Sequence, residues 1–168
     1  MRDELAKGIA EIKKGEIMAF LKIRTMCGHG RGRVSSPDDL TLGVTAKHIK
    51  DRKTPNLSLT VYFPEKLIKE LGWEVSVTRL EVHFGINEDH GCILLSPCID
   101  GVLVSQAGTN GRKPVLQKTI SNLDSIDVIS PPFPSEICGW EVDGNALLLF
   151  PTKLVYRQKP TRKNIHTK

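Results

Sequence analysis

Aromatic residues are scarce in this chain, where phenylalanine, tyrosine and tryptophan make up only 5% of 168 residues. No stretch approaches the roughly 18 consecutive apolar residues that a membrane-spanning helix needs. The N-terminus alternates charged residues with small and apolar ones and lacks the apolar core of a signal peptide. These absences, with an apolar content of 39%, predict a cytoplasmic protein that does not enter a membrane and has a modest core.

The four cysteines form no Cys-x-x-Cys pair and no spacing typical of a disulfide framework. His90, Cys92 and Cys98 are chemically suited to a metal site, but zinc ligands are usually paired more closely in sequence. Cys92 and Cys138 lie in apolar stretches, where a free thiol behaves as a small core residue. We therefore expect no metal and no cofactor.

Catalytic signatures are also missing. The chain has no phosphate-binding loop with Lys-Ser/Thr, no Gly-x-Ser-x-Gly motif and no His-Glu-x-x-His motif. The glycine-rich segment 28–33 follows no clear strand–loop–helix unit. Glu81 and His83 flank an apolar residue in an expected strand, a pattern more typical of a solvated hairpin than of a metal-hydrolase cluster. The sequence therefore predicts a protein that is not an enzyme.

What the chain does contain is a strand, a proline, a short helix and a hairpin in succession. Apolar and polar residues alternate over 57–63, the period of a half-buried strand. Pro64 cannot donate to a β-ladder and suits the start of a helix. Apolar residues at helical spacing predict a helix over 65–71, which Gly72 ends. Two further apolar runs between 75 and 95, joined by a polar turn, predict the hairpin.

This order resembles the AbrB/SpoVT-like swapped-hairpin domain of prokaryotic transcription factors and antitoxins. The resemblance covers residues 57–97, and the chain departs from it at Ser76-Val77, where the family has a Gly-Asp turn. It implies DNA binding, transcription regulation and a homodimer. The matching residues are Phe63-Pro64, Leu67, Leu71-Gly72, Leu80-Glu81-Val82, Gly91 and Ile93 to Pro97.

A degenerate second copy of the unit is predicted over 126–151. Phe133 to Val142 parallels Phe63 to Val75 with the helix shortened by three residues, and both segments contain Gly-Trp-Glu-Val. Because one such unit cannot bury its own apolar face, two units would pair within the chain as a pseudo-dimer or between chains as a homodimer. Trp73 and Trp140 occupy equivalent positions and are expected in the core. The alternative is that proline and glycine residues at similar positions make two unrelated segments look alike by chance.

The expected fold is mainly β with short helices (α+β), with a β-barrel-like body made of the two repeats. The predicted regions are a helical and basic arm over 1–56, the β-barrel body over 57–152 and a basic tail over 153–168, in which 157–168 has the composition of a disordered segment. Helices are expected over 2–14 and 45–52. The expected strands are 57–63, 77–84, 92–96, 102–106, 115–120, 126–130 and 146–150, with a further edge strand at 154–156.

Charge is distributed unevenly along the chain. Residues 21–53 carry eight basic and three acidic side chains, and residues 153–168 carry six basic and none that is acidic. Residues 54–152 carry six basic and twelve acidic side chains. The β-rich body is therefore acidic, and the positive charge lies in its two flanks.

The basic flanks are the best functional candidates, because Arg and Lys neutralise nucleic-acid phosphates. The first hypothesis is a non-enzymatic DNA-binding regulator of AbrB-like type. The alternative is a protein-binding accessory, antitoxin-like or host-directed factor that docks a partner through the acidic body. A solvated surface with a solubilising tail explains the same charges without a ligand. The candidate DNA-contacting residues are Arg31, Arg33, Lys47, Lys50, Arg52, Lys53, Arg157, Lys159, Arg162 and Lys163.

Overall fold

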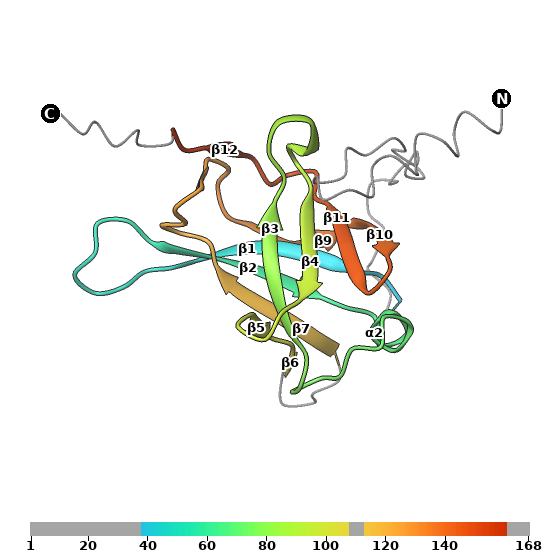
Figure 1. Cartoon of the computed structure of the whole chain (residues 1–168). Helices are drawn as coiled ribbons and strands as arrows, with labels where there is room; N and C mark the ends of the chain where they lie inside the picture. The colour runs from blue at the N-terminus through green and yellow to red at the C-terminus, as the bar shows by residue number, and fades with distance from the viewer. Residues whose placement is uncertain (1–37, 108–112, 161–168) are drawn as a thin grey trace, which may run out of the picture.

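The computed structural model describes residues 38–107 and 113–160, which form three antiparallel sheets and one α-helix (Figure 1). In spatial order, sheet A contains β6 (Ser105–Ala107), β7 (Lys113–Thr119), β2 (Asn56–Tyr62), β1 (Thr41–Lys47) and β9 (Phe133–Ile137). Sheet B contains β10 (Gly139–Asp143), β11 (Ala146–Phe150), β4 (Ile93–Pro97), β3 (Arg79–Phe84) and β5 (Val102–Leu103). The third sheet pairs β8 (Ile126–Val128) with β12 (Tyr156–Gln158). The helix is α2 (Glu65–Glu70), and a 3₁₀ turn, η1 (Asn87–Asp89), follows β3.

The hydrophobic core lies between sheets A and B, and the strands β3 and β4 run across β1 and β2 (Figure 1). Alternate residues of each strand point into this layer, as the pleat of a sheet requires. Leu42 and Leu59 enter it from sheet A, and Leu80, Leu95 and Leu147 enter it from sheet B; each is at most 1% exposed. Most of the core is aliphatic, and Phe63, Trp73, Phe133 and Tyr156 are its aromatic members.

Two strands pass from one sheet to the other. The chain bends at Val104 between β5 and β6, and at Cys138 between β9 and β10. The Val104 N–H donates to the Thr78 carbonyl at 2.9 Å, and the Cys138 N–H donates to the Leu40 carbonyl at 2.9 Å. Strands that change sheets at such bends form the corners of packed sheets. The hydrogen-bonded ladders of sheets A and B remain separate. The expected β-barrel is therefore wrong, because the body consists of two sheets joined at these corners and is not a closed barrel.

The predicted helix after Pro64 is confirmed as α2. Leu67 and Ile68 face the core, and Gly72 ends the helix with a φ of 69°, a left-handed conformation that glycine adopts without strain. Across residues 38–107 and 113–160, no helix is long and apolar enough to cross a membrane. Trp73 follows directly, 5% exposed, with its Nε1–H donating to the Asn145 carbonyl at 3.0 Å.

The helix expected in the second copy is wrong. Phe133–Ile137 is the strand β9, which pairs with β1, because extended backbone there completes the edge of sheet A. Trp140, the counterpart of buried Trp73, lies on the edge strand β10 and is 40% exposed. The two segments therefore differ in structure, and the expectation that Trp140 belongs to the core is also wrong.

Six of the strands predicted from 57 onward overlap single observed strands, whereas the strand expected over 102–106 is divided at Val104 into β5 and β6, which belong to different sheets. Three strands were not predicted: β1, β9 and β10. The helix expected over 45–52 is wrong, because β1 continues to Lys47 in pairing with β2. The edge strand expected over 154–156 lies two residues too early, since β12 is Tyr156–Gln158, and the disorder expected from 157 is wrong for Arg157 and Gln158. The helix expected over 2–14 lies outside the described residues.

Candidate functional site

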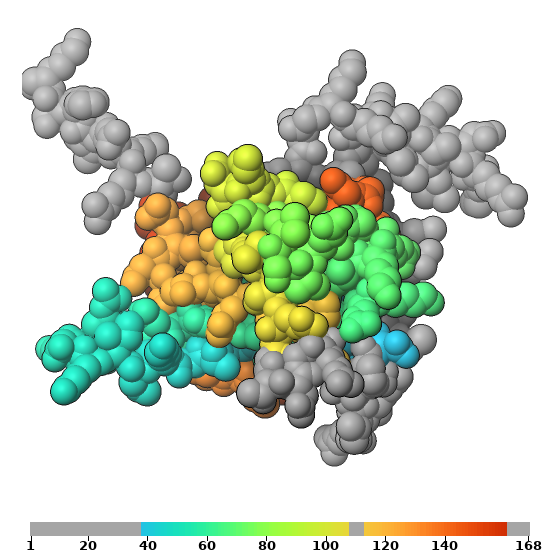
Figure 2. Space-filling model, turned by 90° about the horizontal axis from the view of Figure 1, so that it is seen from below, coloured from blue at the N-terminus to red at the C-terminus, as the bar shows by residue number. Residues whose placement is uncertain are grey.

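The strands β1 and β2 form a two-stranded ribbon that projects from the body (Figures 1 and 2). Thr41–Val44 is buried in sheet A, whereas the last three residues of β1 are exposed although they still pair with β2. The ladder ends at Lys47 opposite Asn56, and the intervening loop turns at Asp51, whose φ is 82°. The pairing of β1 with β2 therefore positions the loop residues away from the packed sheets A and B.

Four predicted phosphate ligands gather on this β1–β2 hairpin. Lys47, Lys50, Arg52 and Lys53 are all exposed, and Asp51 is the sole acid between residues 45 and 56. The Arg52 Nη1 donates to the Asn56 Oδ1 at 3.4 Å, and the ion pairs found in the described part of the chain involve none of these four cations. The tip therefore presents a net charge of +3 to solvent.

The outer face of sheet A continues from the hairpin as a polar surface. The register places hydroxyl and amide side chains from β1, β2 and β7 on this face. Thr45, Ser58, Gln117 and Thr119 are exposed or half-buried, whereas Thr60, farther from the hairpin tip, is buried. A hollow of about 650 Å³ lies at the base of the hairpin between Lys47 and Gln117. Glu136 is the one acid on the strands of sheet A, and its Oε2 lies 2.8 Å from the Lys153 Nζ.

Sheet B has the opposite charge. Its strands carry Glu81, Glu141 and Asp143 against Arg79, whose Nη1 donates to the Gly101 carbonyl at 3.1 Å. The strands of sheet A carry three lysines against one glutamate. Three of the twelve acids of residues 54–152 therefore lie on the strands of sheet B and one on the strands of sheet A, while the others lie outside these two sheets.

Two other predicted phosphate ligands have partners within the fold. The Arg157 Nη2 lies 2.9 Å from the Asp127 Oδ2 across the β8–β12 pair, and the Lys159 Nζ donates to the Leu123 carbonyl at 2.7 Å. Arg157 therefore pairs across the third sheet and Lys159 forms a hydrogen bond beside it, so both side chains are less available to a ligand. Arg31, Arg33, Arg162 and Lys163 lie outside the described residues.

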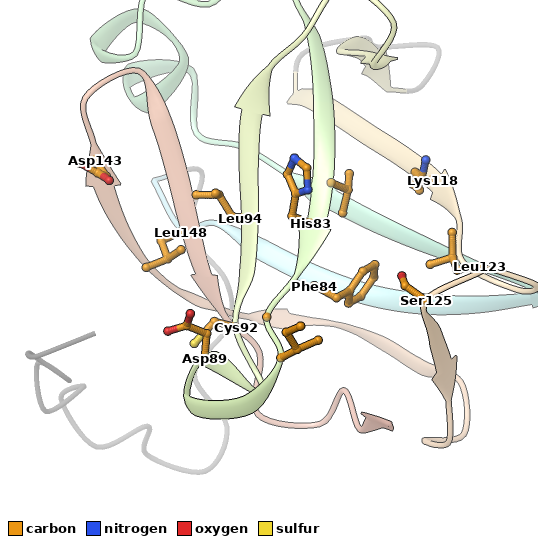
Figure 3. Close-up of a pocket in the computed structure, with 13 residues that line it drawn as sticks. His83, Phe84, Asp89, Cys92, Leu94, Lys118, Leu123, Ser125, Asp143 and Leu148 are labelled. Carbon is orange, nitrogen blue, oxygen red and sulfur yellow. The ribbon is translucent and has the colours of Figure 1, made fainter. Parts of the chain in front are cut away.

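A second hollow, which we call the β3 groove, lies against sheet B (Figure 3). It encloses about 570 Å³ and reaches from the outer face of sheet B, at Leu94 and Leu148, past β3 to Leu123. Figure 3 shows His83 between these two parts, with Lys118 on the far side. This volume suits a small ligand or a few peptide residues. No sequence motif marked the groove, because its walls come from segments distant in sequence.

The end of the groove is unsuited to nucleophilic chemistry. Burial, and secondarily the charge of Asp89, raises the pKa of the Cys92 thiol, which disfavours the thiolate that acts as the nucleophile. The His90 Nε2 lies 2.8 Å from the Tyr156 carbonyl, which fixes the imidazole in a structural contact. No cluster of three His, Cys, Asp or Glu side chains suited to a metal occurs within residues 38–107 and 113–160.

Comparisons with protein-family models, with curated proteins and with solved structures find no match to this chain. The AbrB-like resemblance stays a prediction that rests on residues 57–97. The candidate site is therefore interpreted from its own geometry.

Proposed function

We propose that this protein is a non-enzymatic DNA-binding protein that contacts phosphates through the β1–β2 hairpin. The observation that carries the proposal is the gathering of Lys47, Lys50, Arg52 and Lys53 on one projecting ribbon. The AbrB-like resemblance adds transcription regulation and a homodimer to the proposal. A mass measurement in solution tests the homodimer separately.

The hairpin has the shape and charge that duplex DNA accepts. The major groove admits a two-stranded β-ribbon, and several DNA-binding proteins place such ribbons in a groove. Lysine and arginine side chains at the tip release counterions from the phosphates, which favours binding. The DNA backbone can approach the polar side chains at the base of the hairpin without electrostatic repulsion, because the acids on the strands of sheet B lie in the other layer.

Charge neutralisation in matched pairs tests the proposal. We expect Lys50→Gln with Lys53→Gln to weaken binding to arbitrary duplex DNA at least tenfold at physiological salt. The slope of log affinity against log salt should fall by about 1.8, since each phosphate contact contributes about 0.9. Fluorescence anisotropy over a salt series measures both quantities.

The control is Lys66→Gln with Lys69→Gln, which removes the same charge from exposed positions on α2. This control should bind nearly as tightly as the unmodified protein. Equal losses in the two variants would show that net charge alone drives binding, and no loss in the hairpin variant would refute the assigned surface.

A second candidate function is the docking of a protein partner through the acidic body. The excess of acids on the strands of sheet B favours it, since complementary charge selects partners. One stoichiometric partner that survives nuclease treatment and is lost with Glu141→Lys and Asp143→Lys would support this function over the first.

A further inference from the structure

The upper half of β3 is an open strand edge. On the side away from β4, β5 pairs with β3 only at Arg79 and Leu80. The chain passes so close to Leu80 at Gly101 that a Cβ there would lie 2.4 Å from the Leu80 carbonyl carbon. Because β5 begins at this crossing, Val82–Phe84 has no second strand partner within residues 38–107 and 113–160.

The backbone groups on this edge point toward the β3 groove. The Gly85 N–H donates to the Cys92 carbonyl at 2.9 Å, which places Gly85 among the residues that bond to β4. Successive residues of an antiparallel strand direct their N–H and C=O groups to opposite sides. Val82 and Phe84 therefore direct their N–H and C=O groups away from β4, into the groove.

The walls beside this edge are mainly apolar on the inner side of the sheet, whereas on the outer side Leu94 and Leu148 adjoin His83 and Asp143. Phe84, Leu123 and Ser125 lie together on the inner side in Figure 3, where the groove separates β3 from the segment after β7. On the outer side, Glu81 lies on β3 with its Oε2 3.2 Å from the His83 Nε2. Asp143 also lines the groove, and Lys118 is its one lysine.

We propose that the open edge of β3 binds an extended, basic segment of a partner protein by strand addition. This inference goes beyond DNA binding and gives the second candidate function a site. The partner's backbone would pair antiparallel with Val82 and Phe84, as every strand pair in the described sheets does. Its apolar side chains would enter the slot beside Phe84, and its basic side chains would lie over the acids of sheet B.

A synthetic peptide of alternating lysine and valine, blocked at both ends, is the probe. In antiparallel pairing, residues that bond to Val82 and Phe84 place their side chains on the same face as these two, so the valine amides donate to β3. Methylating the valine amides should weaken binding at least tenfold, whereas methylating the lysine amides should change it less than twofold. A peptide of alternating glutamate and valine should bind at least tenfold more weakly than the lysine peptide.

The matched protein variants are Ser125→Arg, which puts a cation into the groove, and Thr152→Arg, which adds the same charge at an exposed position outside it. Only Ser125→Arg should weaken binding. Equal binding of the two methylated peptides, or no binding of the parent peptide to the full chain, would overturn the proposal. Binding that emerges only after removal of residues 161–168, or self-association abolished by Ser125→Arg, would assign the edge to this chain itself and also overturn it.

Discussion

The side chain of Tyr156 contacts several segments of the fold. Its hydroxyl lies 2.7 Å from the Gly85 carbonyl and 3.1 Å from the Cys92 carbonyl, and it accepts the Gly91 N–H at 2.9 Å. Its ring packs edge-on against Phe84 at 5.2 Å between ring centroids. The residue is 1% exposed, and it connects the last described strand to the turn between β3 and β4.

Replacing Tyr156 by phenylalanine should lower the free energy of unfolding by about 1–3 kcal/mol, because buried backbone groups would lose their partner. Urea denaturation measures this change. Tyr62→Phe on the outer face of sheet A is the control and should change stability by less than about 0.5 kcal/mol. A similarly small loss for Tyr156→Phe would show that water replaces the hydroxyl.

Cys138 makes stability depend on alkaline pH. Burial, with a smaller contribution from the charge of Glu136, raises the pKa of this thiol from 9.0 to about 12. The unfolded chain then loses the proton at lower pH than the folded protein does. The contribution of the group is complete below pH 9.0 and declines, by about 1.4 kcal/mol per pH unit, as the pH rises toward 12.

Urea denaturation of the protein and of Cys138→Ala at several pH values above about 9 tests this dependence. The variant should be less stable at neutral pH, because it leaves a small cavity. The difference between the two proteins should shrink as the pH rises. A constant difference would contradict the raised pKa of Cys138.

Among the elements, those whose pattern is local were predictable. The alternation over 57–63 predicted β2, and Pro64 and Gly72 marked the limits of α2. The segments 45–47 and 133–137 were missed because their conformation depends on strands outside each segment. Lys47 is extended since it pairs with Asn56 across the hairpin, and β9 is a strand since it pairs with β1, which lies far away in sequence.

The junction between β1 and β9 depends on Gly43. The register shifts between Leu42 and Val44, and a Cβ on Gly43 would lie 2.7 Å from the Ser135 backbone nitrogen. Gly43→Ala should therefore destabilise the protein by about 1–3 kcal/mol, measured by thermal or urea unfolding. Thr45→Ala, an exposed change on the same strand, should stay within about 0.5 kcal/mol. Equal effects would show that β9 shifts without cost.

At the scale of the molecule, the opposite net charges on the strands of sheets A and B are a property that the sequence did not reveal. The chain order interleaves the strands of the two sheets, so a count of charge by region does not separate the lysines of sheet A from the three acids of sheet B. The cationic residues of the hairpin were predicted as candidates from charge alone. Their presentation on a projecting ribbon, and the β3 groove, required the long-range pairing.

Because of this separation, neutralising sheet B should barely affect DNA binding. Glu141→Gln with Asp143→Asn should change the affinity for duplex DNA less than about twofold at physiological salt, where charges beyond roughly 8 Å are largely screened. Anisotropy under the conditions used for Lys50 and Lys53 provides the comparison. An increase in affinity as large as the decrease caused by Lys50→Gln with Lys53→Gln would place the bound DNA near sheet B.

The corner strands have a consequence for synthesis on the ribosome. A nascent chain that has emerged only as far as residue 130 exposes β1 and β4, but neither of their outer neighbours, β9 and β11, has yet emerged. The edges of β1 and β4 then carry unpaired backbone donors and acceptors, which are the usual starting points of misassembly. The final thirty or so described residues thus complete both layers almost at once, so a shortened translation product should need chaperone protection that the finished protein does not.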